Sequence, residues 1–214
     1  MIPTINLANS LTIGGNSSLI VGTKWNSADK TTNAVLSGSD YVVTANNSTY
    51  EFARTVRNNL TLDGGGGKFY CECLVGTVTG GDCFFGLLLT ANTITSGANA
   101  FGGANTYAAW RNSGTTVQNN ITNNAIALPW IAGSILGLAI DGVNNKVWVS
   151  LDGSYPIAGD PVAGTNPVWF SFPSGSFAVV FGTDNNAGSD ELTLKTSTAD
   201  LTYTPPAGFT AGLP

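Results

Sequence analysis

Short runs of alternating apolar residues recur along this chain every ten to fifteen residues. Most contain β-branched or aromatic side chains and are bounded by Gly, Asn or Pro, which is the pattern of strands that end in turns. No window of twelve or more residues combines a 3.6-residue apolar period with a helix cap. We therefore predict an almost purely β protein with strands at 18–22, 41–45, 68–78, 82–90, 134–141, 146–152, 168–172, 177–183 and 191–196.

The clearest local prediction is a hairpin between the strands at 134–141 and 146–152. Ile140 and Val147 lie on either side of residues 142–145, Gly-Val-Asn-Asn, and Gly and Asn tolerate the positive φ of tight connections. Strands joined by such turns, in a chain of 214 residues, predict one all-β domain, either a two-sheet antiparallel sandwich or a barrel.

The ends of the chain differ from its centre. Residues 1–24 have weak strand character, and we expect them to form an extra strand or an arm that docks onto a neighbouring subunit. We expect residues 25–203 to form the domain body. Residues 204–214 contain Pro205 and Pro206, which cannot donate to a central ladder, so this segment should run extended across the surface or along a sheet edge.

Charge and residue usage exclude several classes of function. The net charge is −5, only 10% of residues are charged, and no basic cluster occurs, so we expect no nucleic-acid partner. No apolar stretch is long enough for a membrane span, and no basic segment starts a signal peptide. The chain has no His, and we predict no metal and no cofactor.

The three cysteines and one acidic loop could suggest other chemistry. Cys71, Cys73 and Cys83 cannot all pair, and the spacing of the first two puts both on one face of a strand, so we expect buried thiols. Asp184, Asn185, Asn186 and Asp190 place oxygen atoms in a loop but match no EF-hand pattern, and we interpret them as a solvated turn.

Four segments carry motifs that can be compared with known domains. Residues 24–45 contain a Trp-Asn pair and an Asp-Lys pair, and residues 53–75 contain an arginine strand followed by Gly-Lys-Phe-Tyr. Residues 133–170 contain a Gly-x-x-x-Gly-x-x-x-Asp strand, a hairpin and the connection GDPVAGTNP, and residues 203–209 read YTPPAGF. In this order the segments resemble the SPRY-like, concanavalin A-like domains that occur in bacteriophage structural genes. The resemblance implies a two-sheet antiparallel β-sandwich of the SPRY-like jelly-roll kind, located on a virion.

An enzyme is the weaker alternative. Without His, the Ser-His-Asp and Cys-His systems are impossible, and glycoside hydrolysis, which needs two carboxylates, remains the main rival. The three glutamates, Glu51, Glu72 and Glu191, do not share one strand, and Asp190 and Glu191 should face opposite sides. We therefore expect a protein that is not an enzyme.

The candidate binding residues combine aromatic rings with short polar groups, the mixture that sugar-binding surfaces use. Residues 105–114 supply the first four, and the loop SYPIAGDP supplies the fifth; the candidates are Tyr107, Trp110, Arg111, Asn112 and Tyr155. The alternative is that Tyr107 and Trp110 lie in one strand and that at least one of them is in the core.

The resemblance implies a virion structural protein on the particle exterior, a head decoration, fibre or tail appendage. We expect adhesion to a host-surface glycan or protein, contacts with other virion proteins, and a homo-oligomer. A purely structural assembly protein without a host ligand is the alternative, since an uncharged polar surface suits either role.

Overall fold

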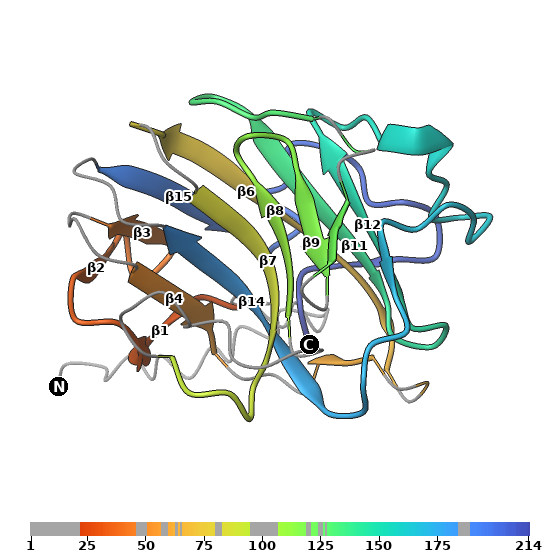
Figure 1. The fold of residues 1–214 in the computed structure, drawn as a ribbon, viewed down its shortest axis with the longest axis horizontal. Helices are drawn as coiled ribbons and strands as arrows, with labels where there is room; N and C mark the ends of the chain where they lie inside the picture. The colour runs from red at the N-terminus through yellow and green to blue at the C-terminus, as the bar shows by residue number, and fades with distance from the viewer. Residues whose placement is uncertain are drawn as a thin grey trace, which may run out of the picture.

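The computed structural model describes residues 22–45, 51–56, 60–62, 64, 66–79, 83–94, 107–118, 121–123, 126, 128–183 and 189–214. Only the backbone is described for residues 107, 117 and 121–123. These parts form two sheets that curve one in front of the other (Figure 1). They contain no α-helix, and hence no helix that could cross a membrane. We expected an arm at residues 1–24, and residues 1–21 of it lie outside the described part of the chain.

Sheet I is built from eight strands, and β5 pairs with β14 beside the main path. Its order is β1 (Trp25–Lys30), β4 (Glu51–Thr55), β14 (Ser176–Thr183), β7 (Cys83–Leu89), β8 (Tyr107–Arg111), β9 (Thr116–Gln118) and β10 (Ile121–Asn123), with β5 at Leu60–Thr61. All of its pairings are antiparallel.

Sheet II also has eight strands, and one short C-terminal strand lies beside β6. Its order is β13 (Trp169–Phe170), β12 (Lys146–Leu151), β11 (Ile135–Asp141), β6 (Lys68–Thr77), β15 (Asp190–Lys195), β3 (Val42–Ala45) and β2 (Ala34–Ser37), with β16 at Thr210–Ala211. The pairing of β16 with β6 is parallel, and the others are antiparallel. A 3₁₀ turn, η1 (Pro156–Ala158), follows β12.

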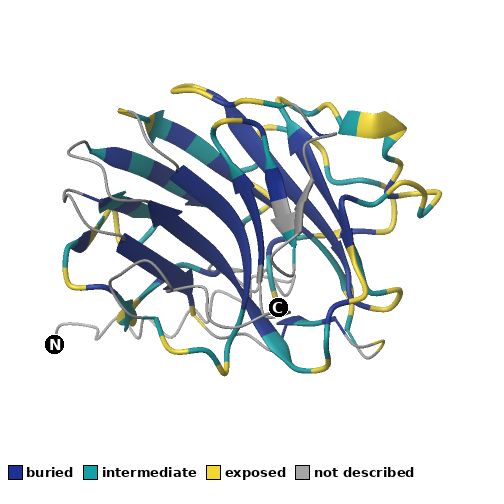
Figure 2. Ribbon diagram, viewed as in Figure 1, coloured by how far each residue is buried: buried dark blue, intermediate teal, exposed yellow. Residues whose placement is uncertain are grey.

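Most strands predicted from the alternating pattern are present. The hairpin is confirmed, since Ile140 pairs with Val147 and the turn ends at Asn145, whose φ is 55°. Side-chain alternation explains why these segments are strands: Val147 and Val149 of β12 enter the core, while Trp148 and Ser150 face outward. Most strand residues are accordingly buried, and most exposed residues lie in the connections (Figure 2).

The core lies between the two sheets and contains the expected buried thiols. Cys71, Cys73 and Cys83 are free and buried, and burial raises the pKa of the Cys71 thiol well above its ordinary value. The same core also contains large aromatic side chains, among them Trp25, Trp169 and the rings of β14. The side chains of this core therefore pack against one another and are not available to a ligand.

The outer face of sheet II is covered by the C-terminal segment, residues 196–213. The segment leaves β15, crosses the outer face, and returns as β16, which pairs with the part of β6 that β15 does not reach. On the way Phe209 packs edge-on against Trp148, with ring centroids 6.4 Å apart. Tyr70, Ala139 and Trp148 thus form a second apolar cluster outside the main core.

One buried carboxylate fixes this covering segment. The Glu72 side chain has no exposed surface. It accepts hydrogen bonds from the backbone N–H groups of Thr202, at 2.6 Å, and Tyr203, at 2.8 Å. The Tyr70 hydroxyl donates a third, at 3.0 Å. Because a buried charge is costly unless it is fully hydrogen-bonded, Glu72 and the segment stabilise each other.

Sheet I has a matching interaction of opposite sign. Arg54 of β4 is buried and pairs with Asp29 of β1 at 2.7 Å. Its guanidinium also donates to the carbonyl of Asn92 at 2.8 Å, which holds the chain after β7 against the sheet. Each sheet therefore uses one buried charge to hold the segment that covers its outer face.

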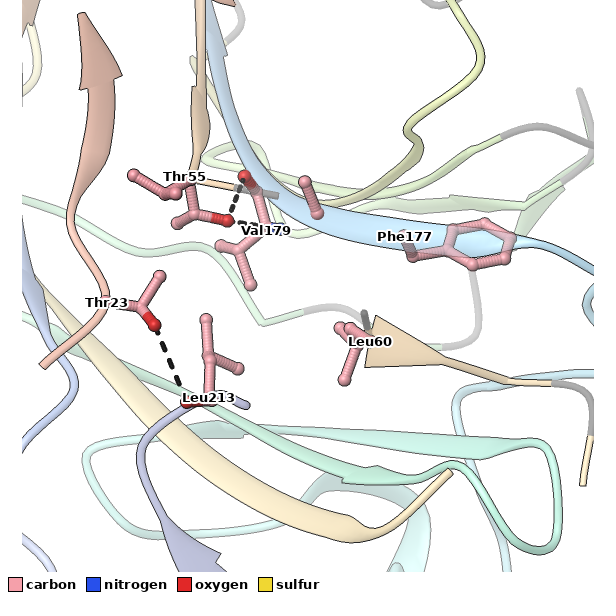
Figure 3. A pocket seen from close by; sticks show the side chains of 8 residues that line it. Thr23, Thr55, Leu60, Phe177, Val179 and Leu213 are labelled. Carbon is pink, nitrogen blue, oxygen red and sulfur yellow. Dashed lines mark hydrogen bonds between the residues drawn. The ribbon is translucent and has the colours of Figure 1, made fainter. Parts of the chain in front are cut away.

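The end of the covering segment also closes a gap between the sheets. Leu213 lies opposite Thr23, Leu60 and Val179 in a narrow pocket (Figure 3). That space has no room for a water molecule. The pocket is a packing gap at the edge of the core and is too small for a ligand.

We predict that Glu72→Gln loosens the C-terminal segment. The amide nitrogen would face one of the backbone N–H donors, so one buried group would lose its partner at a cost of about 1–3 kcal/mol. Hydrogen exchange at the Thr202 and Tyr203 amides should accelerate. Glu191→Gln, on the same face but half-exposed, is the control. Unchanged exchange in Glu72→Gln would contradict the role of this carboxylate.

Candidate ligand-binding site

Trp110 is a core residue and not an exposed anchor. It lies in β8, has no exposed surface, and packs edge-on against Trp130 with ring centroids 6.4 Å apart. Its indole Nε1 donates to the carbonyl of Leu128 at 3.1 Å. The segment 105–114 is thus largely a strand of sheet I, and alternation carries Trp110 inward. This corrects the expectation of an exposed ring at position 110.

The neighbouring candidates stabilise the end of the same strand. Asn112 accepts a hydrogen bond from the Cys83 backbone N–H at 3.1 Å through its side chain. Its backbone N–H donates to the Cys83 carbonyl at 3.0 Å. The Arg111 guanidinium lies over the Phe84 ring at 5.2 Å. Asn112 therefore fixes the turn after β8, and the structure shows a packing contact for Arg111.

The two tyrosines of the prediction are not brought together with these residues. Tyr107 starts β8 and pairs in register with Leu88, but its side chain is not among those described. Tyr155 is half-buried and packs against the cluster of Tyr70, Trp148 and Phe209 on the outer face of sheet II. The five predicted residues do not form one site.

A different group of residues lines an open hollow at one end of sheet II. The hollow has a volume of about 380 Å³. It combines one aromatic ring with amides, a hydroxyl and an ammonium group, and its lining residues are Asn144, Asn145, Lys146, Pro167, Phe170 and Ser171. We call this the Phe170 hollow. The Phe170 side chain is 54% exposed, whereas neighbouring Trp169 is 1% exposed and lies in the core.

The backbone that carries the Phe170 ring is held on both sides by amide side chains. Gln118, from β9 of sheet I, bonds both the N–H and the carbonyl of Phe170. Asn145 does the same for Phe172, at 2.8 Å to the N–H and 2.9 Å to the carbonyl. Ser171 between them has a φ of 57°, a left-handed conformation that such bonds sustain. The exposed ring is therefore presented on a rigid backbone.

The position of the hollow follows from strand register. Phe170, Lys146, Asp141 and Lys68 are paired across β13, β12, β11 and β6, and form one row at the end of the outer face of sheet II. The next row, Trp148, Ala139 and Tyr70, lies beneath Phe209 and the loop after β12. In the first row, the end formed by Lys146 and Phe170 is not covered by these segments, and it lines the hollow.

A second hollow, of about 500 Å³, lies at the C-terminal end of β15. It is lined by Gly22, Tyr41, Thr193, Leu194, Lys195, Ser197 and Asp200. Lys195 donates to Thr202 at 2.7 Å and Ser197 donates to Asp200, so this hollow holds charged groups of both signs. This hollow has no ring comparable in exposure with that of Phe170.

Two acidic residues that flank the β11–β12 hairpin are held by neighbouring groups. Asp141 accepts from Asn144 and pairs with Lys68 at 2.9 Å, and these contacts lower the pKa of its carboxyl despite burial. Asp152 accepts from the Ile135 backbone N–H at 2.8 Å. Among the described residues no group of three Cys, Asp or Glu is placed to hold a metal ion. Residues 184–188 of the acidic loop lie outside the described ones.

Sequence reasoning missed Phe170, although a signal was present. Trp169 and Phe170 are adjacent in a predicted strand, so one of them had to face outward. Which one is exposed depends on the covering loop and on the Gln118 contact from the other sheet. Neither can be read from local sequence.

Trp110→Ala should destabilise the fold and should not remove a binding contact selectively. Truncating a fully buried tryptophan leaves a cavity and costs about 3–5 kcal/mol. Urea unfolding followed by intrinsic fluorescence measures the loss, with Phe170→Ala as a comparison that should change stability by much less. A Trp110→Ala variant as stable as the parent would contradict the burial of this ring.

Tyr155 makes stability depend on alkaline pH. Burial is the main cause that raises its pKa, the Glu72 carboxylate adds to this, the Ser150 hydroxyl opposes it, and the result is about 12. The ordinary pKa is about 10. The stabilising contribution is therefore complete below about pH 10 and is lost as the pH rises through about 12. Urea midpoints between pH 9 and pH 12 should fall less steeply in Tyr155→Phe. Equal slopes would refute this.

Comparisons with known proteins support the fold and leave function open. No family model matches the chain, and no curated protein matches its sequence. Among solved structures, the SPRY domain of human HERC1 is similar with a TM-score of 0.63 and 7% identity, over 84% of this chain and 99% of that one. The TRIM65 PSpry domain gives a TM-score of 0.53 and 12% identity, over 82% and 93%.

A toxin structure shares the same architecture. Stonustoxin is similar with a TM-score of 0.56 and 9% identity, and the match covers 81% of this chain and 27% of that one. At such low identity the likeness concerns fold alone. The described chain is thus an antiparallel, two-sheet β-sandwich with the fold of SPRY domains.

Proposed function

We propose that this chain is a non-catalytic binding domain that attaches to a glycan on a cell surface through the Phe170 hollow. The observation that carries the proposal is the half-exposed Phe170 ring on a backbone bonded by Gln118 and Asn145. A rigid aromatic ring loses little conformational entropy on binding, and a pyranose face can stack on it. The Ser171 hydroxyl and the Asn144 amide oxygen suit sugar hydroxyls, whereas the Asn145 amide and the Asn144 amide nitrogen are engaged with Phe172 and Asp141.

The biological setting that we propose is the exterior of a bacteriophage particle. Its support is the resemblance of four sequence segments, above all GDPVAGTNP at 159–167 and YTPPAGF at 203–209, to SPRY-like domains of phage structural genes. In this proposal the domain is one copy in an oligomeric decoration, fibre or tail appendage, and the host is the bacterium that carries the glycan. Other virion proteins would be its second class of partner.

The absence of catalysis is part of the proposal. Its support is the lack of His in the sequence, together with carboxylates that bond to neighbouring groups, as Glu72 does with the C-terminal segment. The hollow itself contains no carboxylate among its lining residues. Paired carboxylates are what a glycan-cleaving site of the usual kind would require.

A purely structural role is the second candidate, and one observation favours it. The loop after β12 exposes two aliphatic side chains, Ile157 at 45% and Val162 at 58%. Ile157 has a φ of 50°, an unusual conformation for a β-branched residue. Exposed apolar groups on a loop fixed by its own hydrogen bonds suit contact with another protein.

The test is binding of the purified, fluorescently labelled protein to whole cells of candidate host bacteria. We expect saturable binding that washed surface polysaccharide competes away. Phe170→Ala should weaken it at least about tenfold, as expected for the loss of a central aromatic contact. Ile131→Ala is the matched control, because Ile131 is 71% exposed and precedes β11 at the opposite end from the hollow.

Three results would count against the proposal in different ways. Binding lost after protease treatment of the cells but kept after periodate treatment would replace the glycan with a protein receptor. Equal binding of Phe170→Ala and the parent would remove the hollow from the account. No binding at micromolar concentration, with a fixed copy number on purified particles, would favour the structural role.

A further inference from the structure

The lining of the Phe170 hollow contains a cationic side chain and no anionic one. Lys146 is the one charged residue among the six that line it. Asp141 is in register with Lys146 across β11 and β12 and could have neutralised it. Its carboxylate instead pairs with Lys68 on the other side, at 2.9 Å, and accepts from Asn144. The Asp141 carboxylate is therefore engaged by Lys68 and Asn144 and does not pair with Lys146.

The Lys146 ammonium has hydrogen-bonding capacity left. It donates to the Gly164 carbonyl at 2.8 Å. Among the described residues, no carboxylate lies within ion-pair distance of it. An ammonium carries three N–H donors, so two remain for another partner. In a chain with a net charge of −5, this end of sheet II presents a locally positive group beside an exposed ring.

The second hollow provides an internal comparison. Lys195 and Asp200 both line it, so its charges are of both signs. A ligand there would meet attraction from Lys195, which is half-buried, and repulsion from Asp200, which is exposed. The Phe170 hollow is lined by a cation, Lys146, and by no anion. It should therefore prefer an anionic ligand, a preference that the second hollow lacks.

We propose that the Phe170 hollow takes an acidic sugar residue, with its ring against Phe170 and its carboxylate or phosphate on the Lys146 ammonium. This inference rests on the proposed function and names the class of glycan. A charge-assisted hydrogen bond to the anion would add specificity to the stacking contact, which neutral and acidic sugars share. Surface glycans that carry uronic acids, sialic acids or phosphorylated sugars are the fitting class.

The experiment is a titration of the full-length, ¹⁵N-labelled protein followed by amide chemical shifts. The acidic probes are glucuronate, galacturonate, N-acetylneuraminate and glucose 6-phosphate, and the neutral ones are methyl glucoside and methyl galactoside. We expect at least one acidic sugar to shift the amides of residues 144–146 and 170–171, and the neutral sugars to leave them unchanged. A carboxylate and a phosphate source are distinguished by which probe acts.

Two variants separate the local charge from the overall charge. Lys146→Gln should weaken binding of the active probe about tenfold, the effect of losing one charge-assisted hydrogen bond. Lys30→Gln makes the same change of net charge at β1 of sheet I, where the ammonium also donates to a backbone carbonyl, and should bind like the parent. Equal weakening in both variants would overturn the assignment to Lys146.

The remaining outcomes distinguish this inference from the proposed function. Equal shifts from neutral and acidic sugars would overturn the acidic specificity and leave adhesion through Phe170 in place. Shifts from a short Glu-rich peptide but from no sugar would overturn both in favour of a protein partner. No shift from any probe would overturn the inference, while the whole-cell comparison of Phe170→Ala decides the proposed function separately.

Discussion

A β-sandwich whose strands are apolar on both sides must cover its outer faces, and in this protein two buried charges hold the covering segments in place. Glu72 binds the backbone of the C-terminal segment on sheet II, and Arg54 binds the chain after β7 on sheet I. Each charge is buried only because backbone groups and an ion pair or tyrosine satisfy it. The outer aromatic cluster of Tyr70, Trp148 and Phe209 depends on that arrangement.

The open hollow is the place where this covering stops. Phe209 and the loop after β12 cover Trp148 and Tyr70, but the end of the last row, with Lys146 and Phe170, is left accessible. Two contacts that cross between distant segments then fix the exposed edge: Gln118 reaches from sheet I to Phe170, and Asn145 bonds Phe172. Two features thus produce the candidate site: the incomplete covering of the outer face of sheet II, and the hydrogen bonds that hold β13 at its edge. Both involve segments that are far apart in the sequence.

The parts of this structure that follow from local patterning could be predicted, and the parts that follow from long-range contacts could not. Alternation and turn residues correctly predicted β6, β7, β11, β12, β14 and β15 and the hairpin at Gly142–Asn145. The same rule left the face of Trp110 undecided between core and surface, because alternation gives two faces without saying which is covered. Trp110 lies in the core, and Phe170, in the strand predicted at 168–172, is exposed. The register between β12 and β13, which local sequence does not contain, brings Phe170 and Lys146 together.

The central claim is that a rigidly held Phe170 ring is a ligand contact, and whole-cell binding of Phe170→Ala beside Ile131→Ala tests it most directly. The account predicts that the first variant binds at least about tenfold more weakly than the parent, that the second binds like the parent, and that both keep the parent's stability. Parent-like binding by Phe170→Ala, with the fold intact, would contradict it.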